Sequence, residues 1–481
     1  MTMWRGPGNS LLIALAAVLA GCGGGRDNVV PVAVIGNLAG KGEAAQLVRA
    51  SSAEGLVGFD EQGRVIPALA DRWIVTDDGA SYIFRLRDGK WPDGSAITGE
   101  SARTALAQAL AAQRGAALGI DLGAIAEVRA MAGRVLELRL ARPEPDLLQL
   151  LAQPELGLMR RGKGAGPMRG AWQNGWVALK PIAPEDRGMP QEEGWSERAR
   201  TVELHGLSAA NAIARFDEGS MALVLGGRIE DFPRVDIAGL SRGAIRFDQV
   251  LGLFGLAVAH GDGFLGEPAN REAIAMAIDR EGLIAAFGLG NWTATTRLVS
   301  PGVEGDSGAV GERWAGLDLP ARQAEAARRV GGWRGTIAPL RIALPAGPGG
   351  DLLFKRISTD LAAIGLKTER AAPGAPADLR LVDQVARYPR AAWFLDQLGC
   401  ASVKGLCDAA ADSLMARARA EPDPAARAEL LVDAEAQLTR ANAFIPFGTP
   451  IRWSLVSGGV TGFAVNRWGV HPLMPLAMRP K

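Results

Sequence analysis

The sequence is poor in the residues that build catalytic, metal and nucleic-acid sites. Only three histidines occur among 481 residues, at His205, His260 and His471, and their wide separation argues against a histidine-based metal centre. The 53 basic and 52 acidic residues leave a formal net charge of +1, so no clustered positive charge marks a nucleic-acid surface. No Gly-x-Ser-x-Gly nucleophile motif is present either. We therefore expect no enzyme activity, no metal and no cofactor.

Long apolar runs are also lacking, with one short exception near the start. Leu11–Ala20 is apolar but shorter than the ~20 residues of a membrane-spanning helix. Arg5 precedes it, and it ends in Leu19-Ala20-Gly21-Cys22, a pattern typical of a bacterial lipoprotein cleavage box. We expect residues 1–22 to be a signal peptide whose Cys22 thiol accepts a diacylglycerol, and 23–28 to be a flexible tether. An ordinary secretory signal with a chance cysteine is the alternative.

Cysteine usage agrees with export. Besides Cys22 the chain has only Cys400 and Cys407, a possible disulfide in an oxidising compartment. Because the bond would close a short loop, it would stabilise the fold by only ~2–3 kcal/mol. Two free thiols are the alternative reading.

Strand and helix patterns alternate along the chain. Tyr82–Arg87 alternates apolar and polar side chains, which is typical of a half-buried strand. Leu340–Leu344, Asp351–Ile364 and Leu366–Arg370 read as a strand, a helix and a strand, and this unit implies a parallel sheet. A Trp-, Pro- and Glu-rich stretch that runs from Gly164–Pro167 to about Arg198 is expected to be irregular. The fold class is mixed α/β.

Several blocks, taken in order, resemble one family. Glu54–Asp60, Pro67–Trp73, Asp77–Arg87, Asp93-Gly94 and Thr98–Glu100 are similar to the extracellular solute-binding protein family 5, the oligopeptide-, dipeptide- and nickel-binding proteins of ABC importers. Later blocks agree in order and approximate spacing. They are Gly164–Pro167, Phe264 with Arg271–Ile274 and Ala277–Arg280, and Ile445–Phe447 with Gly459–Gly462.

The resemblance implies a two-lobed clamp of the periplasmic binding protein type. Lobe I would comprise residues 29–49, 160–251 and 448–481, and lobe II residues 252–447. Residues 50–159 would form a β-rich subdomain on lobe I, called the β-rich block below. Two crossings between the lobes would act as hinges, and closure would bury a ligand.

The resemblance also locates candidate ligand contacts. In family members, the loop that matches residues 383–391 carries a Trp, then an acidic residue that pairs with a peptide's α-ammonium, then a second Asp. This chain has Gln384, Arg387 and Arg390 at those places, beside Tyr388. A guanidinium repels an ammonium and offers its planar donors to carboxylate or phosphate, so we expect an anionic ligand group there.

Other interpretations of these loops stay open. Arg387 and Arg390 could instead be solvated loop arginines. A second register would place Trp393 and Asp396 at the family's Trp and Asp and restore the ammonium partner. Gly226 and Arg228 follow a predicted strand, where α/β clefts face ligand, although an ordinary turn is equally compatible. Phe254 is expected either to line the cleft or to lie in the core.

We therefore expect a monomeric, lipid-anchored binding protein of the periplasm or cell envelope. It would bind a peptide-like or anionic small molecule and deliver it to the permease subunits of an ABC importer. Its only membrane contact would be the lipid on Cys22, and nucleic acid would not be a partner. The alternative function is a sensor or assembly factor that kept the clamp without a transported cargo.

Overall fold

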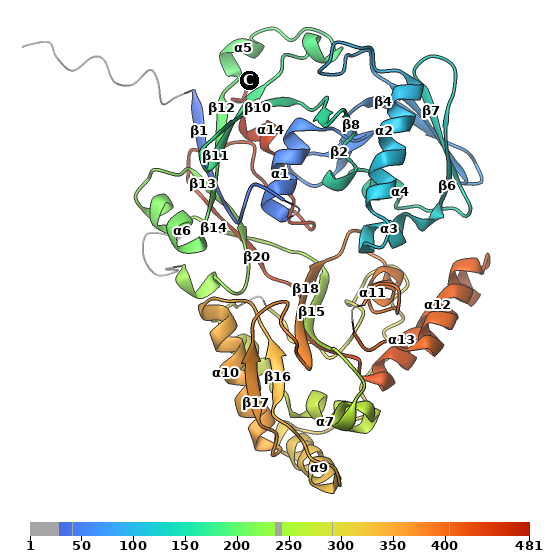
Figure 1. Ribbon diagram of the computed structural model, residues 1–481, viewed down its shortest axis with the longest axis vertical. Coiled ribbons are helices and arrows are strands. Elements are labelled where there is room, and N and C mark those ends of the chain that lie inside the picture. The colour runs from blue at the N-terminus through green and yellow to red at the C-terminus, as the bar shows by residue number, and fades with distance from the viewer. Residues whose placement is uncertain (1–27, 41, 236–242, 291, 404) are drawn as a thin grey trace, which may run out of the picture.

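The computed structural model describes residues 28–481, except residues 41, 236–242, 291 and 404. The predicted signal peptide and the lipidation site Cys22 lie outside the described residues. The described chain forms mixed α/β layers around two large sheets and one smaller antiparallel sheet (Figure 1). The mixed α/β prediction is confirmed.

The first large sheet has seven strands. Its central strand, Val29–Ile35, pairs in parallel with the strands on both sides, so Val32 lies between Leu204 and Leu223. All three side chains are fully buried and fix the register of the sheet. In spatial order the strands are β10 (Met168–Gln173), β11 (Trp176–Pro181), β12 (Thr201–Leu207), β1 (Val29–Ile35), β13 (Leu223–Gly227), β20 (Arg452–Val456) and β14 (Ile245–Asp248).

The β10–β11 hairpin corrects the expectation of an irregular stretch after Pro167. Its turn residues, Asn174 and Gly175, are a strong hairpin signal, and Gly175 has φ +83°. Val177 and Leu179 of β11 are fully buried and pair with β12. The Trp and Pro residues around these positions obscured a regular alternation in the sequence.

Four helices accompany this sheet, and together they form the first lobe. α1 (Glu43–Ser52) lies beside the β-rich block, and α14 (Leu473–Leu476) lies near it (Figure 1). The others are α5 (Trp195–Arg198) and α6 (Ala209–Asp217).

The β-rich block contains a four-stranded antiparallel sheet. Tyr82, Phe84 and Leu86 are buried, which confirms the predicted strand alternation. Thr98 accepts a hydrogen bond from the amide of Ser101 and caps the following helix. In spatial order the strands of this sheet are β4 (Ala70–Val75), β5 (Ser81–Leu86), β7 (Val135–Leu140) and β6 (Ile125–Ala130). Two short strand pairs accompany it, β2 (Val57–Phe59) with β3 (Val65–Pro67) and β8 (Met159–Arg160) with β9 (Lys163–Gly164). The helices of the block are α2 (Gly99–Ala112), α3 (Ala117–Asp121) and α4 (Leu147–Leu151).

The second large sheet has five strands and belongs to the second lobe. Leu340 pairs in parallel with Thr368, which confirms the predicted strand–helix–strand unit. In spatial order the strands are β17 (Thr368–Ala371), β16 (Leu340–Ala343), β18 (Leu379–Val385), β15 (Gly252–Val258) and β19 (Phe444–Gly448). The helices are α7 (Pro268–Ala277), α8 (Arg280–Ala285), α9 (Leu319–Gly332), α10 (Pro348–Ala363), α11 (Ala391–Gln397), α12 (Ala409–Ala420) and α13 (Pro424–Ala441).

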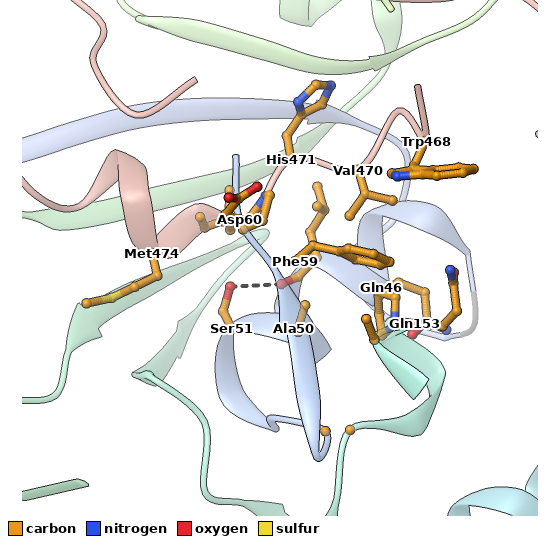
Figure 2. Close-up of a pocket in the computed structure, with 18 of the residues that line it drawn as sticks. Gln46, Ala50, Ser51, Phe59, Asp60, Gln153, Trp468, Val470, His471 and Met474 are labelled. Atoms are coloured by element: carbon orange, nitrogen blue, oxygen red, sulfur yellow. Dashed lines mark hydrogen bonds between the residues drawn. The ribbon is translucent and has the colours of Figure 1, made fainter. Parts of the chain in front are cut away.

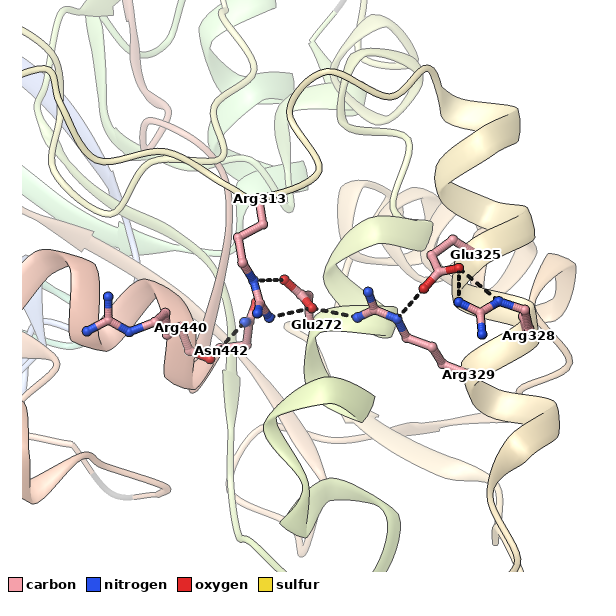
Figure 3. Close-up of polar contacts among 7 residues, drawn as sticks. All are labelled: Glu272, Arg313, Glu325, Arg328, Arg329, Arg440 and Asn442. Carbon is pink, nitrogen blue, oxygen red and sulfur yellow. Dashed lines mark hydrogen bonds and ion pairs between the residues drawn. The ribbon is translucent and has the colours of Figure 1, made fainter.

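A buried carboxylate holds the outer helices of this lobe together. Glu272 on α7 accepts hydrogen bonds from Arg313 and from Arg329 on α9 (Figure 3). Two guanidinium groups thus share one buried charge, so the carboxylate is well compensated. This contact lies in the second lobe, on helices that contribute no residue to the cavity described below.

The chain crosses between the two large sheets twice. Residues 249–251 join β14 to β15, and residues 449–451 join β19 to β20. At the first crossing Gly252 has φ +154°, and a Cβ there would lie 2.0 Å from the carbonyl oxygen of Gln384. Only glycine allows the backbones to approach this closely. The two crossings implied by the resemblance are present, while the exact lobe boundaries stay a prediction.

A buried ion-pair network spans the crossings. Asp383 on β18 of the second lobe accepts a hydrogen bond of 2.8 Å from Arg452, the first residue of β20. Arg228, just after β13, lies 3.5 Å from the same carboxylate and pairs with Glu43. Two arginines of the first lobe therefore converge on one acidic residue of the second.

Cys400 and Cys407 form a disulfide that closes a short loop between α11 and α12. No helix within the described part of the chain is both long and apolar enough to cross a membrane.

Replacing Asp383 with Asn tests the network at the crossings. The substitution keeps the volume but leaves Arg452, whose side chain is 7% exposed, without its buried carboxylate, because its other partner, Glu43, is 3.9 Å away and 58% exposed. We expect the free energy of unfolding to fall by about 3 kcal/mol, because an uncompensated buried charge is costly. Guanidinium chloride denaturation measures the loss. Asp433→Asn, an exposed carboxylate on α13, is the control; equal stability of both variants would contradict the prediction.

Candidate functional site

A cavity of about 700 Å³ lies where the first lobe, the β-rich block and the second lobe meet. The first lobe contributes α1, the ends of β1 and β13, and the segment 468–475. The β-rich block contributes residues 53–68 and 152–157, and the second lobe contributes residues 383–387 at the end of β18. The cavity volume suits a small organic molecule or a short peptide.

Side chains from distant parts of the sequence face one another across this cavity (Figure 2). Gln46, Ala50 and Ser51 come from α1, and Phe59 and Asp60 come from the end of β2. Gln153 lies beside Gln46, and residues of the C-terminal segment form another side of the cavity: Trp468, Val470, His471 and Met474. The wall is therefore largely apolar, with amide groups that can orient a ligand.

The C-terminal segment is held in place by buried polar contacts. His471 Nε2 lies 3.0 Å from the carboxylate of Asp248, the last residue of β14. The indole of Trp468 donates a hydrogen bond of 2.9 Å to the carbonyl of Gly63 in the β-rich block. These contacts place a segment near the end of the chain against residues from its first quarter.

An ion-pair cluster around Glu54 of the β-rich block is nearly closed to solvent. Glu54 accepts a hydrogen bond from Arg187 and also forms an ion pair with Arg87, and all three side chains are at most 13% exposed. Burial lowers the pKa of Arg187, and the neighbouring Glu54 opposes this shift. The negative charge of Glu54 is thus compensated by two arginines of the protein itself.

Four of the predicted site residues line the cavity: Gly226, Arg228, Gln384 and Arg387. Gly226 has φ +79°, at the bulge where β13 and β20 lose register. Gln384 donates a hydrogen bond to Gln397. Arg387 Nη1 lies 3.4 Å from Asp121 of α3, so the guanidinium that was expected to meet an anionic ligand already has a carboxylate partner.

Five predicted residues lie outside this cavity: Phe254, Tyr388, Arg390, Trp393 and Asp396. Phe254 is fully buried against Trp292 and Phe447. Tyr388 and Trp393 are buried in the core shared with the β-rich block, and Asp396 lies beside Arg419. Arg390 pairs with Asp146 and Glu304. Ligand contact by any of the nine stays a prediction.

Two walls of the cavity, helix α1 and the segment 468–475, were not among the ligand-binding residues predicted from the sequence. Gln46 and His471 are more than 400 positions apart, and no local pattern joins them. The aromatic and histidine residues of the tail, which are scarce elsewhere, were the one sequence feature that could have indicated a binding surface there. Within the described residues, no group of three or more His, Cys, Asp or Glu side chains could hold a metal ion.

Comparison with known proteins supports the fold and a family resemblance over part of the chain. Residues 64–182 match the model of bacterial extracellular solute-binding proteins, family 5 Middle. The structure of Haemophilus influenzae OppA in complex with the peptide RPPGFSPFR superposes with a TM-score of 0.81 at 16% identity, and the match covers 94% of this chain and 99% of that one.

Two curated relatives align over shorter stretches. A probable deoxycholate-binding periplasmic protein of Escherichia coli K12, YgiS, is 36% identical over 125 residues, which is 21% of this chain and 23% of that protein. A putative ABC transporter peptide-binding protein of Brucella ovis is 27% identical over 176 residues, 36% of this chain and 33% of that protein. The alignments thus span a third or less of either relative. Residues 64–182 thus resemble the bacterial extracellular solute-binding proteins, family 5 Middle, and the chain as a whole shares the two-lobed fold of the OppA structure.

Proposed function

We propose that the protein is the solute-binding component of an ABC importer and holds a peptide-like or other small ligand in the cavity between its lobes. The observation that carries the proposal is the cavity of about 700 Å³, whose walls come from both lobes and from the β-rich block. Ligand bound there would contact both lobes at once and favour their closed arrangement. The permease would recognise that closed form.

The relatives support binding and transport rather than catalysis. One is named for deoxycholate, another for ABC transport of peptides, and the OppA structure contains a nonapeptide. These ligands differ widely, so they define a class of protein and not the cargo of this chain. We propose a monomer without chemistry of its own, exported to the periplasm or cell envelope and anchored through lipidated Cys22.

Of the predicted contacts, Arg387 is the best placed to meet a ligand. A guanidinium carries five N–H donors, so its pair with Asp121 leaves donors for a ligand oxygen. Gln384 and Arg228 face the same cavity. Arg390 is the natural comparison, because it also pairs with a carboxylate of the β-rich block but does not line the cavity.

Native mass spectrometry of the purified protein should reveal a retained small molecule, and adding that molecule should raise the melting temperature. Filling the cavity with Ala50→Trp should weaken binding at least about tenfold, because a bulky ring would occupy the ligand's space. Ala112→Trp, at an exposed position on α2, is the matched control. Unchanged affinity in Ala50→Trp would place the ligand elsewhere, and no stabilisation by any nutrient would favour the sensor or assembly role.

The pair Arg387→Ala and Arg390→Ala tests direct contact with the retained ligand. Loss of a charged hydrogen bond costs about 1.5–3 kcal/mol, so we expect Arg387→Ala to weaken binding roughly 10- to 100-fold. Arg390→Ala removes an interlobe ion pair but no cavity-lining group, and we expect a several-fold smaller effect. Isothermal titration calorimetry measures both. Equal losses would mean that Arg387 acts only through its contact with the β-rich block.

A further inference from the structure

The β-rich block and the second lobe meet through two ion pairs that lie close together in the sequence of the second lobe. Arg387 pairs with Asp121 at the end of α3, and Arg390 pairs with Asp146 just before α4. In Figure 1, α3 and α4 lie directly above α11 of the second lobe. We call these four residues the interlobe clasp.

The clasp is embedded in an excess of buried carboxylates. Asp121 is almost fully buried, the side chain of Asp396 is 12% exposed, and Glu144 and Tyr388 lie near them. The side chain of Asp121 has no exposed surface, and its Oδ1 accepts no hydrogen bond within the described residues. Tyr388, which could donate one hydrogen, is buried in the same core. Negative charge is therefore gathered where little water can solvate it.

Burial determines how these groups bind protons. It raises the pKa of Asp121 to about 7; Arg387 opposes the shift, and Asp396 and Glu144 reinforce it. Burial also raises the pKa of Asp396 to about 6, against the pull of Arg419 and Arg142 and with support from Asp412.

Three further groups at this interface shift in the same direction. Burial raises the pKa of Glu144, with support from Asp146 and against Arg142 and Arg390. Burial raises the pKa of Asp146 as well, against Arg390 and with support from Glu304. The pKa of Tyr388 also rises because of burial and its acidic neighbours.

We propose that the interlobe clasp is a proton-sensitive lock, in which protonation of its buried carboxylates favours the closed arrangement of the two lobes. The lock rests on the lobe movement of the proposed function, but it does not depend on which ligand is bound. When the lobes separate, the carboxylates become hydrated and lose the cause of their unusual proton affinity.

The direction of the pH effect on lobe closure follows from the linkage between proton binding and conformation. The closed form binds protons more tightly than the open form, so closure is favoured as the pH falls through the closed-state pKa. With a closed-state pKa of about 7 and an ordinary value of 3.8, Asp121 alone shifts the closed-to-open ratio about 30-fold between pH 8 and pH 5.5. Above pH 8 the ionised carboxylates oppose closure by burial and mutual repulsion.

Interlobe distances in the full chain without ligand test the lock. Nitroxide labels on Ala126→Cys in β6 and Ala425→Cys in α13 report the separation by electron spin resonance, with Cys22→Ser removing the remaining thiol because Cys400 and Cys407 are bonded. We expect the closed-to-open ratio to rise at least about tenfold from pH 8 to pH 5.5. An unchanged distance distribution in this otherwise unaltered chain overturns the proposal.

Two substitutions locate the effect. Asp121→Asn should abolish most of the pH dependence, because the amide has nothing to titrate, and Asp396→Asn is a second variant if the first does not fold. Asp77→Asn, an exposed turn carboxylate of the β-rich block, should keep the full response. Full pH dependence in both buried variants would also overturn the lock. Since no ligand is added, failure to find a cargo would weaken the proposed function and leave this outcome unaffected.

Discussion

The fold depends on two short chain crossings that join two separately formed sheets. Each sheet has its own register and its own apolar residues, while residues 249–251 and 449–451 carry the chain between them. Where the first crossing enters the second sheet, Gly252 lies close against the backbone of the neighbouring strand β18, which fixes how the chain enters the second lobe. This geometry creates an interface that can hold a cavity, and Arg228, Gln384 and Arg387 line it.

Charge at this interface is arranged in pairs that reach from one lobe to the other. Asp383 binds arginines of the first lobe, and Arg387 binds an aspartate of the β-rich block. Buried pairs of this kind add little net stability compared with apolar packing, but they specify geometry because an unpaired partner is costly. The network therefore determines the relative geometry of the lobes more than it adds to the stability of their contact.

The same pairing constrains the ligand. Glu54, Asp383 and Arg387 all line the cavity, and each already has an oppositely charged partner in the protein. A ligand ion would have to share one of these partners or project toward solvent. The amides of Gln46 and Gln153 and the apolar groups around them are free of that competition for charge.

The family resemblance, the mixed α/β class and the alternating strand of the β-rich block could be predicted from the sequence, because they depend on local order and period. The sequence also identified Arg387 as a departure from the family's loop. The packing of the folded chain was needed to show that Arg387 pairs with Asp121, that Phe254 and Trp393 lie in the core, and that α1 and the tail share a cavity. Those contacts join residues tens to hundreds of positions apart, and their energies arise from burial, which no local pattern encodes.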